Sequence, residues 1–362
     1  MDNIIAIGVM SGTSVDGLDV VAAEFRQIND KWSYRIIRSR TVNYPGDLKK
    51  RLIECIGYSA EELIFLDHTF GEFIGRQVRH FLDEQDIHPD LIASHGHTVF
   101  HQPEKGITFQ IGDGQTIHQV TGLPVINDFR KIDVLRGGQG APLVPVGDKL
   151  LFGDYEFCLN IGGFSNISFD NTRNERIAYD IGPANIILNH VARMEGRDYD
   201  EGGNQARSGK LINDLFSQLN ALPYYSMKSP KSLGLEWVQK NIHARINTTH
   251  FAQQDLMRTF AEHVAFQTDT AIKKEKNLNF SDKECRVLVT GGGVYNNFLM
   301  DRLAERAEGF TYVVPEKGII DFKEALIFAF LGVLRYREQI NIWKSVTGAR
   351  QDSSGGTIHF HK

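Results

Sequence analysis

Apolar residues in this chain fall into short runs that glycine-rich and polar turns separate. Runs rich in β-branched and aromatic residues predict strands, and apolar residues that recur every three to four positions predict helices. Strands are expected at residues 4–10, 18–26, 32–42, 91–94, 107–111, 124–127, 156–161, 165–169, 176–180, 286–290 and 311–313. Helices are expected at residues 46–57, 60–85, 113–121, 184–195, 209–219, 232–241, 252–275, 295–307 and 322–339. Because the two kinds of element alternate, the pattern predicts an α/β protein with mixed sheets.

One pattern occurs twice in the chain. IIAIGVMSGTSVDGLDVVAAEF at 4–25 and FCLNIGGFSNISFD at 157–170 are each an apolar strand, a glycine- and serine-containing turn and a second strand. A later strand, CRVLVTGGG, ends on three glycines and leads into a helix. A chain of 362 residues is long for a single core, so the repetition predicts two related domains. We expect an N-terminal domain of residues 1–128 plus about 340–362, and a C-terminal domain of residues 129–339.

The composition is that of an ordinary soluble protein, with 41% hydrophobic residues, 23% charged residues and a net charge of −5. This balance lacks the basic excess of a nucleic-acid binder, and no apolar run approaches the ~20 residues that a membrane helix needs. The first residues do not resemble a secretory signal. Cys55, Cys158 and Cys285 form no Cys-x-x-Cys pair, which favours reduced, buried thiols. We therefore expect a cytoplasmic protein that binds neither nucleic acid nor membranes.

The glycine turns are candidate phosphate sites, because such turns expose backbone N–H groups and let an anion approach the chain closely. The carboxylate of Asp16 in the first turn would repel a phosphate unless it serves Mg²⁺ through water. The chain has no P-loop motif, dinucleotide fingerprint, HExxH motif or cysteine cluster. A single glycine turn often only reverses the chain. Three in this arrangement favour a nucleotide held between two hairpins, the layout of the actin, Hsp70 and sugar-kinase superfamily.

Several blocks of the sequence resemble the anhydro-N-acetylmuramic acid kinase family. They occur in the family's order and cover the chain from end to end. Two positions depart from the family pattern, because Ala184 replaces an expected glycine and His97 stands where glutamine is common. The blocks are GVMSGTSVDGLD (8–19), SHGHTVFHQP (94–103), NDFRKIDVLRGGQGAPLVP (127–145), LNIGGFSNIS (159–168), YDIGPANIILN (179–189), PKSLGLEWV (230–238) and LVTGGGVYNNFLM (288–300).

The resemblance implies two actin-like (ribonuclease H-like) domains around an interdomain nucleotide cleft. It also implies a reaction in which ATP, Mg²⁺ and water convert 1,6-anhydro-N-acetylmuramic acid to N-acetylmuramic acid 6-phosphate, in cell-wall recycling. The 6-oxygen of this sugar bridges to C1, so water must open the bridge before the freed oxygen can attack the γ-phosphate. Such an enzyme needs a base for the water and stabilisation of the transferred phosphoryl group. The resemblance further suggests a homodimer.

The nucleotide-binding residues implied by the resemblance lie in three glycine-rich segments. The first would hold the β- and γ-phosphates, with Asp16 in the Mg²⁺ shell and Asp19 at the start of the next strand. The second is the other hairpin, and the third lies before a helix and lets the nucleotide approach the backbone. The residues are Gly12, Thr13, Ser14, Val15, Asp16, Gly17, Leu18, Asp19, Gly162, Gly163, Asn166, Gly291, Gly292 and Gly293.

Asp180 is the candidate catalytic base. It ends a predicted strand, and Pro183 favours a helix that starts there, so Asp180 lies outside the capping position. A role as a helix cap therefore fits poorly. The carboxylate matches the family's catalytic aspartate.

His97, Thr98, Arg130 and Glu324 are the candidate sugar-binding residues. The planar guanidinium of Arg130 suits the lactyl carboxylate of the sugar, although a salt bridge to a neighbouring aspartate is an alternative. Glu324 opens a helix, where an acidic residue is also favoured by the helix dipole. The histidines around 97 cluster, but no nearby cysteine or carboxylate completes a metal site, so we favour substrate contact or core packing.

Three other functions use parts of the same pattern. An actin- or Hsp70-like ATPase switch would use the same hairpins, but no substrate-binding or filament-forming insertion is visible. Another sugar or carboxylate kinase of the superfamily would use Asp180 to deprotonate a hydroxyl group. A glycosidase would use two carboxylates and leave the phosphate loops without a role. Product analysis with ATP and the anhydrosugar distinguishes these functions.

Overall fold

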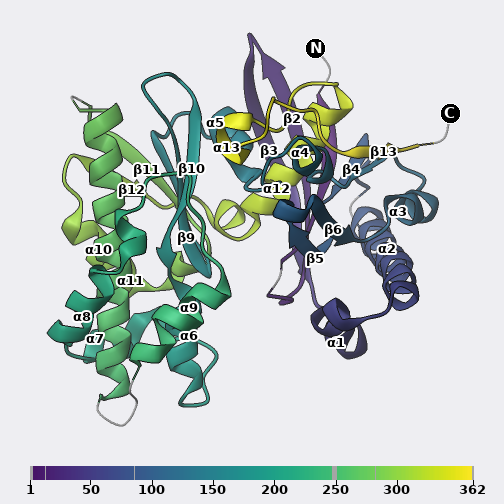
Figure 1. The fold of residues 1–362 in the computed structure, drawn as a ribbon. Coiled ribbons are helices and arrows are strands. Elements are labelled where there is room, and N and C mark those ends of the chain that lie inside the picture. The colour runs from purple at the N-terminus through teal and green to yellow at the C-terminus, as the bar shows by residue number, and fades with distance from the viewer. Residues whose placement is uncertain (1–2, 13, 85, 247–250, 282, 361–362) are drawn as a thin grey trace. The chain divides into compact units, whose positions relative to one another are not determined.

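The computed structural model describes residues 3–12, 14–84, 86–246, 251–281 and 283–360 of the chain. The chain divides into two compact units, whose elements are labelled in Figure 1. The first unit consists of residues 1–151 and 322–362. The second unit consists of residues 152–321.

A six-stranded mixed sheet forms the centre of the first unit. Its strands are β1 (Ile4–Ser11), β2 (Leu18–Ile28), β3 (Lys31–Val42), β4 (Leu91–Ser94), β7 (Val125–Asn127) and β13 (Thr357–His359), and β5 (His97–Gln102) forms a separate hairpin with β6 (Ile107–Ile111). The strand order is β13-β7-β4-β1-β2-β3, with antiparallel pairs except for β1–β4 and β4–β7. The helices are α1 (Gly46–Glu54), η1 (Cys55–Gly57), α2 (Ala60–Asp83), η2 (Pro103–Lys105), α3 (Gly114–Thr121), α4 (Lys131–Leu135), α5 (Val144–Leu151) and α13 (Lys344–Thr347).

The second unit has a five-stranded mixed sheet. Its strands are β8 (Phe157–Ile161), β9 (Phe164–Asp170), β10 (Arg176–Pro183), β11 (Cys285–Thr290) and β12 (Phe310–Val313). The order is β10-β9-β8-β11-β12, with β8, β9 and β10 antiparallel and β11 parallel to both β8 and β12. The helices are α6 (Asn185–Arg193), η3 (Glu201–Gly203), α7 (Asn204–Ser208), α8 (Asn213–Asn220), η4 (Pro223–Ser226), α9 (Leu235–Asn241), η5 (His243–Arg245), α10 (Gln253–Asn279), η6 (Gly292–Tyr295) and α11 (Asn297–Arg306).

The two sheets share one topology. In each, three consecutive strands form an antiparallel meander, and the next two strands of the sheet add in parallel beside the first strand of that meander. The first sheet carries β13 as an additional edge strand. This order is that of the ribonuclease H-like domains of actin-like proteins, so the predicted fold class and the predicted duplication are confirmed.

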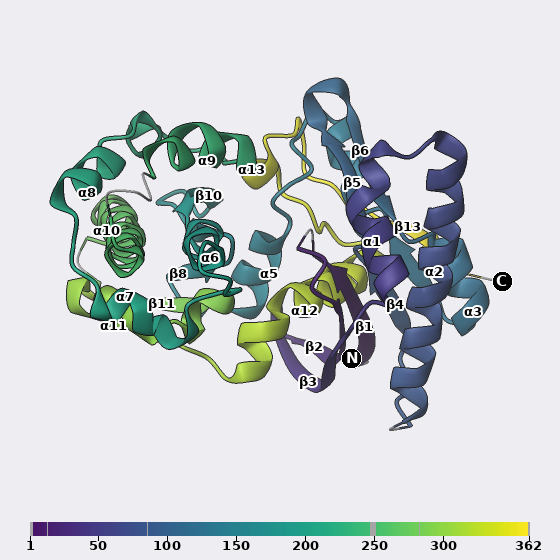
Figure 2. The ribbon, with the colours of Figure 1, turned by 90° about the horizontal axis from the view of Figure 1, so that it is seen from below.

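Helices cover both faces of the first sheet, and β1 shows this residue by residue. Ile7 and Val9 are fully buried in a cluster that includes Phe70 of α2. Gly8 points to the opposite face, where α12 (Lys317–Tyr336) lies so close that a Cβ atom on Gly8 would be 1.9 Å from the Ala325 carbonyl oxygen. Figure 2 shows α2 and α12 on the two sides of this sheet. Cover on both faces explains why β1 is an almost continuous apolar run.

Small and aromatic residues hold α12 on the sheet. A Cβ atom on Gly332 would lie 2.5 Å from the Ala93 Cβ atom, so no larger residue fits there without a shift. The ring of Phe330 packs against Phe25 with a centroid distance of 5.4 Å. The helix and the sheet therefore pack closely against each other.

The packing of α12 on the first sheet determines where the chain divides into its two units. Residues 322–339 belong to the first unit because their helix lies on the first sheet, and residues 129–151 belong to it with α5, whose Gly147 contacts Ile327 of α12. The domain boundaries that we expected near residues 128 and 340 differ from this division for that reason. A helix that contains Lys317–Asp321 and continues into the first unit gives no break in its apolar pattern to mark the boundary.

The core of the second unit forms around α10. Phe260, Val264 and Ile272 of this helix are buried, and α10 contacts α6, α7, α8, α11 and β10. Leu159 of β8 and Val287 of β11 contribute fully buried side chains from the sheet to the same cluster. The long helix thus stabilises the sheet that carries the second glycine hairpin.

The predicted elements are present, with ends that differ by a few residues. β5, α4, α5, α7, α13 and β13 were not predicted, and α12 begins before the expected residue 322. The missed elements are short, and short elements depend on tertiary contacts more than on their own sequence pattern. The three cysteines are buried and free, as expected. No helix among the described residues is both long and apolar enough to cross a bilayer.

Substitution of Gly8 by alanine tests the close approach of α12. We expect Gly8→Ala to lower the free energy of unfolding by about 2 kcal/mol or more, because the new methyl group pushes α12 away from the sheet. Gly46→Ala is the control, since a Cβ atom at Gly46 meets nothing within 4 Å and α1 gains a better helix former. Urea unfolding of both variants measures the effect, and equal stability of Gly8→Ala and wild type would contradict the packing argument.

Candidate functional site

The first glycine turn joins β1 to β2 and has a constrained backbone. Val15 has a φ of 51°, and its N–H donates to the Gly12 carbonyl at 3.1 Å. A Cβ atom on Gly17 would lie 2.5 Å from the Thr41 methyl group, so this position requires glycine. Ser14 is exposed at the turn, whereas the predicted residue Thr13 lies outside the described residues. The turn therefore presents backbone and hydroxyl groups to solvent, as a phosphate site requires.

The two carboxylates of this turn differ in their surroundings. Asp16 is exposed and has no hydrogen-bond partner among the described residues. Asp19 is half-buried and accepts a hydrogen bond from the Thr41 hydroxyl at 2.6 Å. No group of three or more metal-ligating side chains occurs in the described part of the chain. A single free carboxylate fits Mg²⁺, which usually keeps several waters and binds through one or two carboxylates and substrate phosphates.

A buried hydrogen-bond chain supports the end of β1. The Tyr44 hydroxyl donates to Ser11 Oγ at 2.7 Å, and Ser11 Oγ lies 3.1 Å from His97 Nδ1. His97 is 4% exposed and also hydrogen-bonds to the Leu52 backbone. Burial lowers the pKa of His97 below its usual value. The structure thus places the ring of His97 inside the first unit, behind the glycine turn.

Arg130, Thr98 and Glu324 lie in the first unit with this turn. Arg130 precedes α4, and its Nη1 group donates to the Gly140 carbonyl at 2.7 Å. Burial lowers the pKa of Arg130 to about 10, while the charge of Glu324 raises it, so the guanidinium stays charged at neutral pH. Thr98 lies on β5 and accepts a hydrogen bond from the Gln110 amide at 3.4 Å. Glu324 lies on α12 and is exposed to solvent. The protein around its carboxyl group partly excludes water and raises its pKa, while the positive charge of Arg130 lowers the pKa.

In the second unit, the strand register places polar residues in a row across one face of the sheet. Asp180 of β10 is opposite Asn166 of β9, which is opposite Asn160 of β8. Thr290 of β11 continues the row beside Asn160. Residues opposite each other in a sheet share a face, so these four side chains lie side by side. The predicted residues Asp180 and Asn166 are therefore brought together.

Three groups hold Asp180 in place. Its Oδ2 atom accepts from the Leu233 N–H at 2.9 Å, its own N–H donates to the Lys231 carbonyl at 3.2 Å, and its carbonyl accepts from the Tyr224 hydroxyl at 2.6 Å. A β-bulge follows Asp180 and changes the register before Gly182, as bulges beside functional sites often do. Burial raises the pKa of Asp180, and the Leu233 amide lowers it. A carboxylate with a raised pKa is a better proton acceptor.

The second glycine hairpin is tied to the start of α6. The Gly163 carbonyl accepts from the N–H groups of Ala184 and Ile186, and the Gly162 carbonyl accepts from Asn185. The hairpin thus satisfies the first N–H groups of α6, which would otherwise lack partners. Gly163 itself is exposed, so its backbone is available to a ligand.

The third glycine segment, Gly291–Gly293, directly follows Thr290, the last residue of the polar row. A Cβ atom on Gly291 would lie 2.6 Å from Asn160 Oδ1, and one on Gly293 would lie 2.2 Å from Ile161 Cγ2. Both positions therefore require glycine. Gly292 between them is exposed. The predicted glycines 162, 163 and 291–293 accordingly lie around the ends of β8 and β11.

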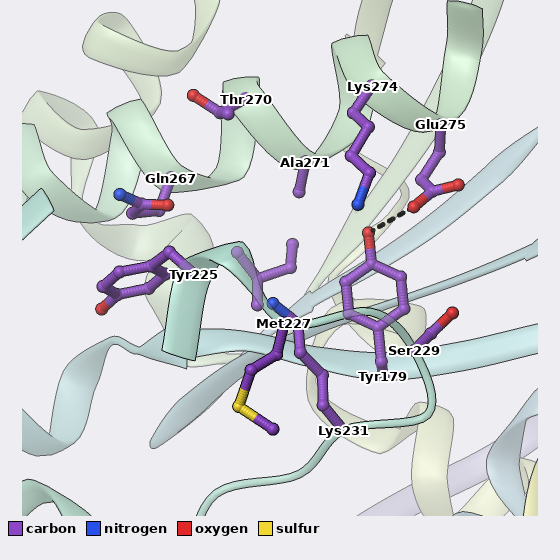
Figure 3. A pocket seen from close by; sticks show the side chains of 11 residues that line it. Tyr179, Tyr225, Met227, Ser229, Lys231, Gln267, Thr270, Ala271, Lys274 and Glu275 are labelled. Carbon is purple, nitrogen blue, oxygen red and sulfur yellow. Dashed lines mark hydrogen bonds between the residues drawn. The ribbon is translucent and has the colours of Figure 1, made fainter. Parts of the chain in front are cut away.

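A cavity lies beside β10, between this strand and α10 (Figure 3). Tyr179 donates to Glu275 at 3.1 Å across it, and the Lys231 ammonium lies over the rings of Tyr179 and Tyr224. Tyr179 precedes Asp180, so its side chain points to the opposite face of the strand. The residues that we predicted from the sequence do not line this cavity.

Several residues that hold the predicted site residues Asp180 and Arg130 in place were not identified from the sequence. Tyr224, Leu233 and His95 contact Asp180 or Arg130 directly. Leu233 belongs to the PKSLGLEWV block, which marked the segment but not its function. No periodicity connects Tyr224 to a strand that lies 44 residues earlier, so only the fold reveals this contact.

The chain has relatives among known proteins. The family model for anhydro-N-acetylmuramic acid kinase matches residues 4–361. The proteins of this name from Actinobacillus pleuropneumoniae serotype 7 and Aliivibrio fischeri are each 34% identical to this chain, and each match covers 98% of both sequences. Among solved structures, the ADPNP-bound activator of 2-hydroxyisocaproyl-CoA dehydratase from Clostridium difficile has a TM-score of 0.44 at 11% identity, covering 92% of this chain and 97% of that one. Glucose-bound hexokinase from Schistosoma mansoni has a TM-score of 0.45 at 11% identity, covering 91% and 85%.

The raised pKa of Asp180 predicts a pH-dependent difference in stability. Because folding disfavours the charged carboxyl, Asp180→Asn should gain stability relative to wild type as pH rises from the ordinary aspartate pKa through the raised one. Below this window the difference should no longer change with pH, because the carboxyl is then protonated in both the folded and the unfolded wild type. Urea unfolding at a series of pH values measures it, with the exposed Asp198→Asn as control. A variant that loses stability relative to wild type as pH rises would contradict the raised pKa.

Proposed function

The chain belongs to the anhydro-N-acetylmuramic acid kinase family, and from this premise we propose how its residues carry out the reaction. The family model spans nearly the whole chain, so the protein is a kinase that acts on 1,6-anhydro-N-acetylmuramic acid with ATP. The observation that carries our mechanism is the position of Asp180, held by the Leu233 amide in a row of polar side chains. Family membership also supports a cytoplasmic homodimer that takes part in cell-wall recycling.

The proposed reaction joins a hydrolysis to a phosphoryl transfer. Asp180 takes a proton from a water molecule, whose oxygen attacks C1 of the sugar. The bond between C1 and the bridging 6-oxygen breaks, and this oxygen attacks the γ-phosphorus with departure of ADP. General-base assistance and positioning are the contributions that the protein makes to such a step.

Each glycine segment has a proposed role toward ATP. Residues 12–19 would bind the phosphates through backbone N–H groups, and Asp16 would hold Mg²⁺ through water. Bound Mg²⁺ neutralises charge on the phosphate oxygens. The exposed backbone of Gly163 would bind a phosphate as well, while Asn166 would position it, and Gly291–Gly293 would let the nucleotide lie against the backbone.

The sugar contacts are proposed for the first unit. Arg130 would bind the lactyl carboxylate, because its guanidinium is charged and lacks a carboxylate within ion-pair distance among the described residues. Thr98 and Glu324 would contact hydroxyl or amide groups of the sugar. His97 is buried behind the glycine turn, so we propose that it supports Ser11 and the turn more directly than the sugar.

Isotope labelling tests the hydrolytic opening. When water attacks C1, a reaction in ¹⁸O-water should place the label at C1 and leave the 6-phosphate unlabelled. The C1 label must be read quickly, since a reducing sugar exchanges this oxygen with solvent. ADP and sugar phosphate should form in equal amounts, and neither should form without the anhydrosugar. Labelled inorganic phosphate as the main product would indicate an ATPase, and an opened sugar with intact ATP would indicate a glycosidase.

Asp180→Asn tests the base. We expect kcat to fall about a hundredfold or more, while binding of the anhydrosugar stays close to that of wild type. In the wild type, kcat should fall as pH drops below the raised pKa of Asp180, because the protonated carboxyl accepts no proton. The control is Asp198→Asn, which should keep full activity. Activity of Asp180→Asn within a few-fold of wild type would remove Asp180 from the mechanism.

A further inference from the structure

The Arg130 guanidinium is held by a histidine instead of a carboxylate. Arg130 Nε donates to His95 Nε2 at 3.1 Å, and Arg130 Nη2 lies 2.8 Å from the same nitrogen. His95 is 5% exposed and lies directly after β4. His95 Nε2 thus lies within hydrogen-bond distance of both nitrogens, Nε and Nη2, on one edge of the guanidinium.

This contact requires a neutral ring with a defined tautomer. Arginine only donates, so His95 Nε2 must carry a lone pair, and the proton then belongs on Nδ1. His95 Nδ1 lies 2.9 Å from the Gly96 carbonyl oxygen, which accepts a hydrogen bond from this N–H group. Burial and the charge of Arg130 lower the pKa of His95 well below its usual value, so the ring stays neutral.

Two further contacts fix the guanidinium from other directions. Arg130 Nη1 donates to the Gly140 carbonyl, and the Gly140 N–H in turn donates to the buried Asp133 carboxylate at 2.7 Å. The ring of Phe328 on α12 packs against His95 with a centroid distance of 4.6 Å and lies 6.0 Å from the guanidinium carbon. Arg130 therefore has little freedom to rotate.

These contacts leave part of the guanidinium available. Of its five N–H groups, three have partners among the described residues, two on His95 and one on Gly140. No carboxylate of the described chain lies within ion-pair distance of Arg130, and Glu324 acts on it only through its field. The positive charge is consequently held in place without being neutralised.

We infer that His95 is a positioning residue, which holds Arg130 by one edge so that the remaining N–H groups bind the lactyl carboxylate of the sugar. This inference rests on the proposed function of Arg130. An aspartate or glutamate at position 95 would also orient Arg130, but its charge would weaken attraction for a carboxylate ligand. A neutral acceptor gives orientation and keeps the full charge.

Two substitutions test the roles of the two ring nitrogens of His95 separately. In His95→Gln the amide oxygen can reach the place of Nε2 and accept from Arg130. In His95→Asn the shorter side chain reaches only the place of Nδ1, so it can bond near Gly96 but cannot hold Arg130. Both variants are neutral and polar, which makes them a matched pair.

The measurement is the dissociation constant of two sugars by calorimetry. One is 1,6-anhydro-N-acetylmuramic acid, and the other is 1,6-anhydro-N-acetylglucosamine, which lacks the lactyl carboxylate. We expect wild type and His95→Gln to prefer the first sugar to a similar degree, and His95→Asn to lose about tenfold or more of this preference. Affinity for the second sugar should be similar in all three proteins, which a general loss of structure would not produce.

The outcomes distinguish this inference from the function on which it rests. A wild type that binds both sugars equally removes the carboxylate contact from Arg130 and overturns both proposals. A wild type that prefers the first sugar, with His95→Asn unchanged, overturns only the role of His95. If His95→Asn does not fold, a crystal structure of wild type with the first sugar gives the answer. The carboxylate should lie on the N–H groups of Arg130 that do not contact His95, and a carboxylate bound elsewhere would overturn the inference.

Discussion

The first unit depends on one backbone contact, the approach of α12 to β1 at Gly8 and Ala325. Because no side chain separates them, helix and sheet have a fixed distance, which positions the residues of α12 that belong to the first unit. Lys323 forms a buried ion pair with Asp148 of α5 at 2.7 Å, and the next residue, Glu324, is accessible to solvent. One turn later Phe328 covers His95 and Arg130. A burial requirement of the core thus determines where the candidate sugar-binding groups lie.

The two units use the same topology for different chemical purposes. In the first, the turn between β1 and β2 offers exposed backbone and a free carboxylate, and its support is the buried chain from Tyr44 to His97. In the second, the corresponding hairpin is tied by its carbonyls to α6, and the sheet offers a row of side chains that ends in Asp180. Repetition of a fold therefore need not repeat a site, because the site depends on side chains and turn conformation.

The sequence predicted the fold class and most elements, because buried strands and long helices leave strong periodic patterns. It also predicted where the glycine turns and Asp180 lie in the fold, since they occur at the ends of such strands, while their roles stay predictions. It could not predict the partners of those residues. The contacts of Tyr224 with Asp180 and of His95 with Arg130 join segments whose distance along the chain carries no pattern. The unit boundaries were missed for a related reason, because α12 continues through the boundary as one helix.

The discontinuous first unit has a consequence for biosynthesis. Residues 1–151 leave the ribosome well before residues 322–362, with the whole second unit between them. The Ile7 side of the first sheet can pack on α2 at once, but the part of its Gly8 side that α12 covers stays open until α12 emerges. The second unit is contiguous, so it can complete its core while the first still exposes an apolar sheet face. Nascent chains paused at this stage would present that face to chaperones, and stable closure would follow only after the last segment is translated.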